Sequence, residues 1–479
     1  MNQTVKDSVA GAIFLLLTAT GPALGQQPAP PVPQPGAPSQ PGAPGEPQQP
    51  GVPGQPGQPG VPEPRPEAPP ITEVPVAPAQ RDPGSAAGVV PEDLVPAEQP
   101  TLVRPPTFLG PDLFNPPVPR GWITVTPTFT LSGEYNDNIF NSSSDRTSDF
   151  IIGLVPGVTL SVQRPEYRLL AGYNLTSEIF VSESEQSEFA KRHDLFADGF
   201  YLLSPRTRLT LRERFVYDED TSIVSSGGES AGRRNALRNT LTLGVNHQLT
   251  ELTLLRAAVS QTHVQFDGDT TARDSDTFRL LVGADHQFTG RLTGTADFDS
   301  AYVTVQGESD AYPQRARLGF DYRITQTLTG GLSAGPSILI RDDDVHITPA
   351  ISARVTQLFR FGSLRAGYDR SVTATTFGLA DRHTIYATLG ISQLVRGLRL
   401  DVTPRYTIED HEFENGGATD RKVDVVSLNL RLTYQLTTSL SAIGCYTFRH
   451  QSESNGRNED IDQNRVFLGV QYAFPITVY

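Results

Sequence analysis

One five-residue string in the chain matches the signature of a serine nucleophile. Residues 331–335 read Gly-Leu-Ser-Ala-Gly, which has the Gly-x-Ser-x-Gly spacing. That chemistry needs a sharp turn from a strand into a helix, so that the serine is exposed. Here the string lies in a segment where small residues alternate with others, which predicts one continuous strand. We therefore do not predict a catalytic role for Ser333.

The other residue types that support catalysis or metal binding are scattered. None of the eight histidines forms a His-x-x-x-His pair, no phosphate-binding loop is present, and Cys445 is the single cysteine. The acidic runs 218–220 and 342–344 offer carboxylates, which divalent cations prefer, but we favour solvated loops for both. The sequence therefore predicts no enzyme activity, no cofactor, no metal site and no intrachain disulfide.

The functional residues that the chain does carry are charged side chains, which occur at alternate positions along extended segments. These residues share the polar parity of their segments, so we predict that they line one common surface. The predicted surface residues are Arg208, Arg212, Arg214, Arg256, Arg279, Arg315, Arg317, Arg323, Arg354, Arg365, Arg399, Arg405, Arg431, Asp297, Asp299, Asp321, Asp369 and Asp401, with Asp194, Asp198 and Asp285 beside them.

Two interpretations of these charges are open. Opposite charges on neighbouring strands could pair and form the wall of a wet interior. Alternatively, the excess of arginine could favour the passage of anionic solutes, because rings of charge tune the selectivity of pores.

The segments that carry these charges alternate strictly between apolar and polar residues. In 423–436, for example, Leu428, Leu430 and Leu432 share one parity, while Asn429 and Arg431 share the other. About eighteen such segments (between sixteen and twenty) fill residues 122–479, joined alternately by short turns and longer polar connections, as in a membrane-spanning barrel. We predict an all-β fold: a transmembrane antiparallel up-and-down β-barrel.

Strand length separates this fold from the soluble alternatives. Strands of soluble sandwiches and propellers average about 5–6 residues, whereas a tilted membrane strand needs at least about 9–11. The segments here are roughly twice the soluble length. A barrel of about sixteen to eighteen strands also leaves an aqueous lumen, which an eight-stranded barrel does not.

Composition agrees with a membrane barrel and argues against nucleic acid as a partner. The 479 residues have 37% hydrophobic content and a formal net charge of −14. A barrel can look soluble by hydropathy, because each apolar residue is followed by a polar one. Binding nucleic acid would instead require a basic surface.

The first 121 residues predict a different organisation. Residues 1–25 resemble a secretory signal peptide, with Lys6 followed by a short apolar core. Residues 26–100 form a disordered proline- and glycine-rich arm that we expect to act as a periplasmic spacer. Residues 101–121 form a barrel-proximal linker, which could anchor to the barrel rim or contact a periplasmic partner. The barrel then occupies 122–479.

Two residues test the register of the predicted strands. Glu213 falls on the lipid-facing parity, where a charge is costly, so a β-bulge or a register slip near 212–214 is expected to correct it. Arg370 falls on the outer face near the external rim. The last strand is expected to stop at Phe474, leaving 475–479 as a tail.

The connection 218–238 is the longest, and it could fold inward and narrow a pore.

Two short motifs near the start of the barrel resemble a known family. They are Glu134-Tyr135-Asn136-Asp137-Asn138-Ile139, and Asp149-Phe150-Ile151 followed by Pro156-Gly157-Val158. Over about 120–479 the chain resembles the β-barrel porin type 2 family, including members associated with exopolysaccharide and PEP-CTERM systems. The resemblance implies an outer-membrane barrel linked with polysaccharide export and no catalytic residues. For Asp137 and Asn138 themselves, we expect a turn-forming role.

Two functions remain open. The first is an aqueous passage through the outer membrane of a Gram-negative bacterium, for polar solutes or exported exopolysaccharide, surrounded by outer-membrane lipid. The second is a structural or anchoring protein, whose arm contacts peptidoglycan or a periplasmic export partner.

Overall fold

We analysed a computed structural model of the protein. It describes residues 122–225, 228–268, 272–342, 344–392, 395–411, 421–454 and 460–478. The expected signal peptide, proline-rich arm and linker lie outside these residues. The described residues contain no helix that is long and apolar enough to cross a membrane.

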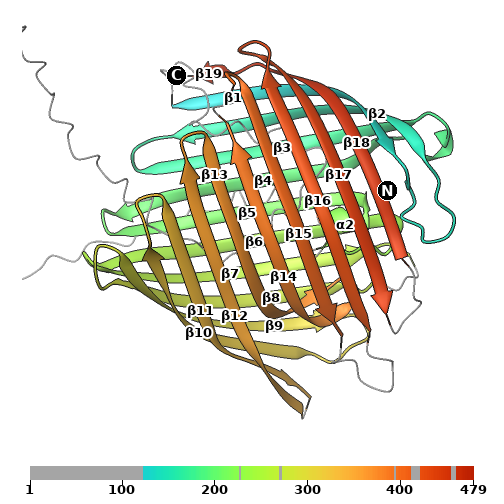
Figure 1. The fold of residues 1–479 in the computed structure, drawn as a ribbon. Helices are drawn as coiled ribbons and strands as arrows, with labels where there is room; N and C mark the ends of the chain where they lie inside the picture. Colours follow the sequence, from blue (N-terminus) through green and yellow to red (C-terminus); the bar gives the residue numbers. More distant parts are fainter. Residues whose placement is uncertain are drawn as a thin grey trace, which may run out of the picture. The chain divides into compact units, whose positions relative to one another are not determined.

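The described residues form a single antiparallel sheet (Figure 1). Its strands are β1 (Ile123–Asn136), β2 (Asp149–Gln163), β3 (Tyr167–Phe180), β4 (Glu188–Ser204), β5 (Thr207–Asp220), β6 (Arg233–Thr250), β7 (Thr253–Phe266), β8 (Ser275–Gln287), β9 (Leu292–Val305), β10 (Ala311–Arg323), β11 (Leu328–Arg341), β12 (Asp344–Phe359), β13 (Gly362–Thr375), β14 (Gly378–Ile391), β15 (Leu398–Asp410), β16 (Lys422–Gln435), β17 (Leu440–Ser454), β18 (Asp460–Ala473) and β19 (Ile476–Val478). Two short helices, η2 (Ser184–Gln186) and α2 (Thr221–Val224), lie in connections.

The sheet closes into a barrel of eighteen strands, which confirms the predicted fold class. Consecutive strands pair antiparallel, and β18 pairs with β1 from Thr128 opposite Ala473 to Asn136 opposite Arg465. The chain end differs from the expected free tail, because β19 adds three residues beside the start of β1. Pro475 lies between β18 and β19 and interrupts their pairing with β1, since proline has no backbone N–H to donate.

Connections at the two ends of the barrel differ in character. Turns of a few residues join β2 to β3, β4 to β5 and the later even–odd pairs, at what we call the turn end. Odd–even pairs meet at the opposite long-loop end, through connections such as 137–148 and 221–232. The connection between β13 and β14 is a tight hairpin, because these two strands keep pairing as far as Thr375 and Gly378.

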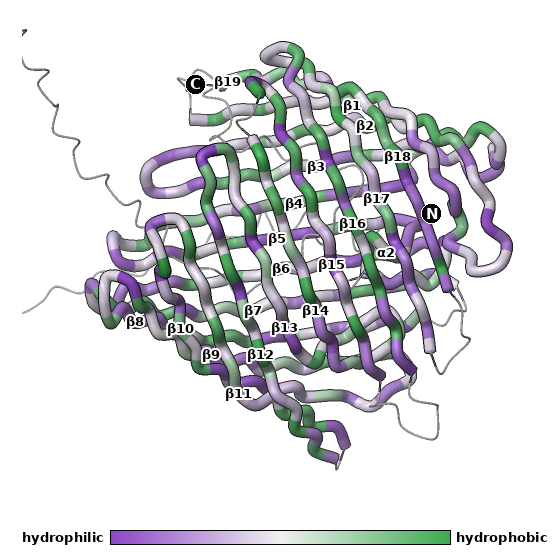
Figure 2. The backbone as a smooth tube through the Cα atoms, in the orientation of Figure 1, coloured by the Kyte–Doolittle hydropathy of each residue, from purple (hydrophilic) through white to green (hydrophobic). Residues whose placement is uncertain are grey.

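The outer face of the barrel is apolar over most of its height. Side chains such as Leu318 and Phe320 are exposed on this face, whereas Arg317 of the same strand is buried on the other face. Figure 2 shows hydrophobic and hydrophilic positions alternating along many of the strands. Towards the long-loop end this face carries hydrogen-bonded pairs, including Tyr173 with His193 at 2.8 Å. Exposed apolar residues bounded by aromatic girdles are the surface that a bilayer covers.

The two register details have different outcomes. Pairing of β5 with β4 and β6 continues without a shift from Leu209 through Tyr217, so the expected bulge near 212–214 is wrong. Glu213 therefore stays on the outer parity, between Ala197 and Leu241 of the neighbouring strands. Arg370 also lies on the outer parity, and its guanidinium contacts Asp381 of β14 at 2.6 Å.

Candidate functional site

The polar faces of the strands point into the barrel. The guanidinium of Arg465 on β18 lies 2.8 Å from the carboxylate of Asp220 on β5, although four strands separate them around the wall. The same guanidinium lies 2.7 Å from Glu134 of β1. Side chains from strands this far apart can meet only in the interior, so the parity that carries the charges is the inner one.

Most of the arginines predicted from the sequence pair with carboxylates on this face. Arg256, for example, lies 2.8 Å from Asp285 and 2.9 Å from Asp297. The other ion pairs are Arg212–Asp198, Arg214–Asp194, Arg279–Asp299, Arg315–Asp299, Arg317–Asp369, Arg354–Asp321 and Arg399–Asp401. The inner wall is thus a lattice of opposite charges running from strand to strand.

The remaining predicted arginines share the same parity. The guanidinium of Arg208 lies over the ring of Phe200, 4.4 Å from its centroid. Arg431 stands opposite Asp401 and Cys445 in the register, and Arg405 opposite Tyr386 and Ser427. Arg323 and Arg365 follow this parity on β10 and β13.

Other predicted positions show no arrangement suited to catalysis or to metal binding. Ser333 sits in the middle of β11, opposite Gly319 and Ser352, with no helix after it. The described residues contain no group of three or more His, Cys, Asp or Glu side chains placed to hold a metal ion. Asp218 and Asp220 instead pair with Arg192 and Arg465.

The described residues 228–232 of the connection from β5 to β6 reach across the interior at the long-loop end, as expected for a connection that folds inward. The backbone N–H of Ser230 donates to the side-chain oxygen of Gln451 on β17 at 2.7 Å, and the amide of Gln451 donates back to the Ser230 carbonyl at 3.1 Å. Glu229 accepts hydrogen bonds from Thr376 at the β13–β14 turn. The loop leaves β5 and reaches strands on the far side of the barrel, so it constricts the lumen.

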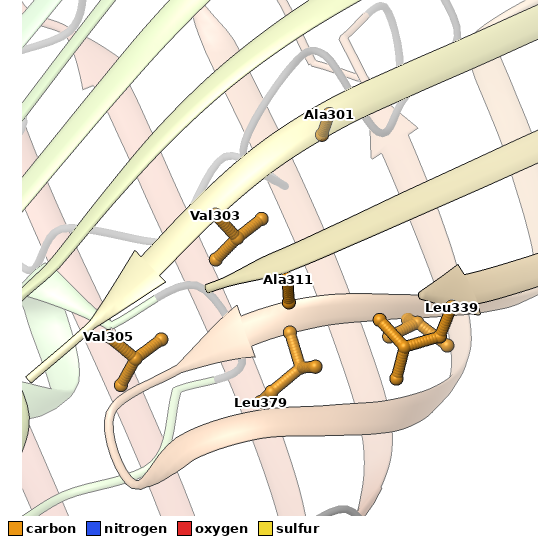
Figure 3. Packing of buried hydrophobic residues seen from close by; sticks show 7 residues of the cluster. Ala301, Val303, Val305, Ala311, Leu339 and Leu379 are labelled. Carbon is orange, nitrogen blue, oxygen red and sulfur yellow. The ribbon is translucent and has the colours of Figure 1, made fainter. Parts of the chain in front are cut away.

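The β13–β14 hairpin completes the constriction by folding away from the wall. β13 pairs with β12 only as far as Arg370 opposite Ile351, and beyond this point the hairpin bends inward. Its tip residue Leu379 packs against β9, β10 and β11 in a buried apolar cluster (Figure 3). The cluster consists of Ala301, Val303, Val305, Ala311, Leu339, Val372 and Leu379.

Polar contacts hold this hairpin tip against neighbouring loops. The carbonyl of Thr376 accepts the backbone N–H of Arg273 at 2.9 Å. Glu308 binds the guanidinium of Arg341 at 2.7 Å and also that of Arg273. Gly378 has φ 124°, and a Cβ there would collide with the Glu308 carboxylate, so only glycine fits this close approach.

A charged hub anchors the crossing loop. One Glu229 carboxylate oxygen accepts the backbone N–H and the hydroxyl of Thr376, both at 2.8 Å. The other accepts the Ser225 hydroxyl at 2.9 Å. Glu409 at the end of β15 binds Arg382 of β14 at 3.0 Å, and His411 lies 3.9 Å from Glu409. Glu229 and Glu409 are both fully buried.

Two residues of the hub that lie outside the strands have pKa values that differ from their ordinary values. Burial raises the pKa of the Glu229 carboxyl, but nearby Arg382 and the hydrogen bonds from Thr376 outweigh it, so the pKa lies below its ordinary value. Burial, reinforced by Arg421, lowers the pKa of His411 to about 4. Glu229 is therefore ionised and His411 neutral at neutral pH.

The family-like motif at 134–139 also acts at the long-loop end. Asn138 closes its loop by bonding Ser142 in both directions, at 2.8 and 2.9 Å. Asp137 accepts the backbone N–H of Asn464 on β18 at 2.6 Å. These contacts support the expected turn-forming role and tie the first loop to the strand that closes the barrel.

Sequence reasoning missed the hub, because its residues come from three separate segments. Glu229 lies in a loop, Arg382 lies near the start of β14, and Glu409 and His411 lie at the end of β15 and directly after it. The one available signal was parity, which places Arg382 and Glu409 on the inner faces of adjacent strands.

A closed eighteen-strand barrel with an apolar exterior, a charged interior and an inward loop defines a porin-type membrane barrel. The chain belongs to the family described as "Putative beta-barrel porin 2", which it matches over residues 119–474. This confirms the resemblance inferred from the motifs. No protein with a curated description matches the sequence.

Several solved barrels are remotely similar in fold. Pseudomonas aeruginosa OpdQ has 10% identity and a TM-score of 0.40, covering 74% of this chain and 98% of that chain. P. aeruginosa OpdK with vanillate has 10% identity and a TM-score of 0.41, covering 74% and 99%. Acinetobacter baumannii OccAB3 has 12% identity and a TM-score of 0.39, covering 74% and 99%. Likeness at this level carries no information about the solute.

Proposed function

We propose that the protein is a passive channel for polar solutes in the outer membrane of a Gram-negative bacterium. The observation that carries this proposal is the inner wall of the eighteen-strand barrel, which carries ion pairs such as Arg256–Asp297 and Arg354–Asp321. A barrel of this strand number encloses water. Charged side chains on its inner face are hydrated, whereas a sealed structural barrel needs no such wall.

The orientation belongs to the same proposal. Outer-membrane barrels place short turns in the periplasm and long loops outside. On this basis the turn end is periplasmic, and residues 26–100 extend into the periplasm. The constriction formed by the connection from β5 to β6 and by the β13–β14 hairpin then lies at the external mouth.

We propose a preference for anionic solutes. The arginines that the sequence assigns to the inner face, among them Arg365, Arg405 and Arg431, outnumber the aspartates assigned to it. Rings of arginine favour anions in pores. Acidic groups at the constriction, including Glu229 and Glu308, oppose this bias, so the expected selectivity is moderate.

A narrower form of the function is export of an exopolysaccharide, which the sequence resemblance implies. A polymer of this width requires the loop 221–232 to leave the lumen, since Ser230 and Glu229 contact the far wall. Deleting the gene in its host and measuring secreted polysaccharide tests this form. Normal secretion after deletion rules it out without affecting a channel for small solutes.

Planar-bilayer recording of the purified chain tests the channel itself. We expect stepwise conductance, and swelling of liposomes in small sugars. A barrel that folds and inserts but never conducts contradicts the proposal. In that case, loss of peptidoglycan binding on removing residues 26–100 would favour the anchoring function instead.

A further inference from the structure

We infer that the inner wall of β2–β6 holds, at the turn end, a binding site for sugars that carry a carboxylate, centred on Arg168 and Arg208. The inference rests on the proposed channel function and names the class of solute that the channel binds. It is carried by two inner-face arginines that lack a carboxylate partner, in a sector of the wall rich in hydroxyl and amide groups.

The strand register places the two arginines on either side of one aromatic ring. Arg168 of β3 lies directly opposite Phe200 of β4. Arg208 of β5 lies on the other side of Phe200, two residues nearer the turn end. Phe200 shares the parity of Asp198, which is inner, and directly opposite residues of neighbouring strands point to the same face. Since strands lie about 4.8 Å apart, the two arginines flank Phe200 within two strand spacings.

Phe200 holds the guanidinium of Arg208 in a defined orientation. The guanidinium carbon lies 4.4 Å from the centroid of the Phe200 ring, within the range of a cation–π contact. A planar guanidinium stacked on a ring keeps the N–H groups at its edge available, and these groups bind a carboxylate through two parallel hydrogen bonds. Phe200 is therefore a positioning residue, and Arg208 is the group that contacts the solute.

No carboxylate of the described residues occupies either arginine. Arg212, further along β5, pairs with Asp198 at 3.2 Å. Arg168 and Arg208, in contrast, form no ion pair with any residue that the structure describes. Arg168 is exposed and Arg208 half-buried, so both guanidinium groups can be reached by a solute in the lumen.

The wall around the two arginines carries hydrogen-bonding groups and no acid. Between the turn end and the height of Asp198, the described inner-face positions of β2–β6 contain no acidic residue. They include the hydroxyls of Ser161 and Thr210 and the amides of Gln163 and Asn246. Hydroxyl and amide groups both donate and accept hydrogen bonds, as the hydroxyls of a sugar require. The sector therefore suits a sugar ring with one carboxylate.

The arrangement favours a sugar acid over a planar aromatic acid. The guanidinium of Arg208 already covers the ring of Phe200, so this ring offers little surface on which an aromatic solute can stack. The neighbouring hydroxyl and amide groups instead match the hydroxyls of a sugar. Contacts on an exposed wall are also weak enough for the solute to leave, which passage through a channel requires.

Block of the ion current by added solute, in the full-length chain, is the primary test. Glucuronate should block the wild type at a concentration at least about tenfold lower than glucose does. Arg168→Gln combined with Arg208→Gln should raise the half-blocking concentration of glucuronate about tenfold and leave that of glucose unchanged. Phe200→Leu should raise it about two- to fivefold. Arg291→Gln, in the exposed β8–β9 turn at the same end, should behave as the wild type.

A second readout follows binding without relying on conduction. In saturation-transfer NMR on the folded barrel in detergent, the ring protons of glucuronate should receive magnetisation from the wild type and from Arg291→Gln. The double variant of Arg168 and Arg208 should lose most of this transfer.

The two readouts separate failure of the site from failure of the channel. Equal block by glucuronate in the wild type and the double variant overturns the site. Stronger block by benzoate than by glucuronate overturns the assignment to sugars and gives the site to aromatic carboxylates. Saturation transfer that depends on the two arginines, in a barrel that never conducts, overturns the channel function and leaves the binding site intact.

Discussion

Arg465 illustrates how single buried residues hold this barrel closed. It lies on β18 and binds Glu134 of β1 and Asp220 of β5, so it joins both sides of the closure between the first and last strands. All three side chains are largely buried. Removal of one partner from a buried ion pair leaves uncompensated charge, which is much more costly than losing an exposed pair.

We predict that Arg465→Gln destabilises the barrel by about 3–5 kcal/mol. Urea unfolding of the refolded barrel in detergent measures this. The control is Arg212→Gln, whose pair with Asp198 is well exposed and should contribute less than about 1 kcal/mol. Equal effects from the two variants would contradict the assigned roles.

At the residue scale, the sequence predicted on which face of its strand a residue lies, but not which residues it contacts. Parity assigned Arg256, Arg315 and Asp299 to one surface, because side-chain direction in a strand has a period of two. Which residues meet across the lumen depends on how the loops fold inward, and no local pattern encodes that. The role of Glu229 as an anchor therefore could not be predicted from the sequence, because it depends on the contact with Thr376.

The constriction depends on a segment of the barrel wall, the β13–β14 hairpin, that bends away from its neighbouring strand. The β13–β14 hairpin departs from β12 at Arg370, and its tip relies on Gly378, where φ is positive and Glu308 approaches closely. A non-glycine residue in such a conformation costs on the order of 1–3 kcal/mol. The added Cβ would also push the tip away from Glu308.

We predict that Gly378→Ala loosens the constriction and raises single-channel conductance at neutral pH. Gly290→Ala is the matched control, since Gly290 lies in a turn where an added Cβ would meet no neighbouring atom and φ is not positive. Unchanged conductance in Gly378→Ala would show that the hairpin tip does not narrow the passage.

At the element scale, strand positions followed closely from alternation. The sequence predicted about eighteen alternating segments in 122–479, and the barrel wall has eighteen strands. The failures occur where tertiary contacts override local pattern. The expected bulge at 212–214 is missing because the outer surface tolerates Glu213 beside Asn239, with which it forms a hydrogen bond. The hairpin at 371–381 continues to pair because it packs inside the barrel.

For the whole molecule, the balance of inner charges determines which ions pass. Arginines on the inner wall outnumber the acids that were assigned to it from the sequence. We predict moderate anion selectivity, reduced in the double variant Arg405→Gln with Arg431→Gln. The reversal potential in a salt gradient measures this, and Arg146→Gln, in an exposed loop, should leave it unchanged. Cation selectivity in the wild type would contradict the prediction.

The strand number could be predicted because each alternating segment of sufficient length forms one strand of the barrel. The lumen could be predicted because barrel width increases with strand number. The solute was not, since selectivity arises from the constriction, and its residues come together only through long-range contacts. Family membership agrees with the class of protein but names no solute.

The most direct test of the central claim is planar-bilayer recording of the purified, folded chain. An aqueous channel predicts stepwise conductance, with a reversal potential on the anion side in a salt gradient. A bilayer that stays insulating although the chain is folded and inserted would contradict it.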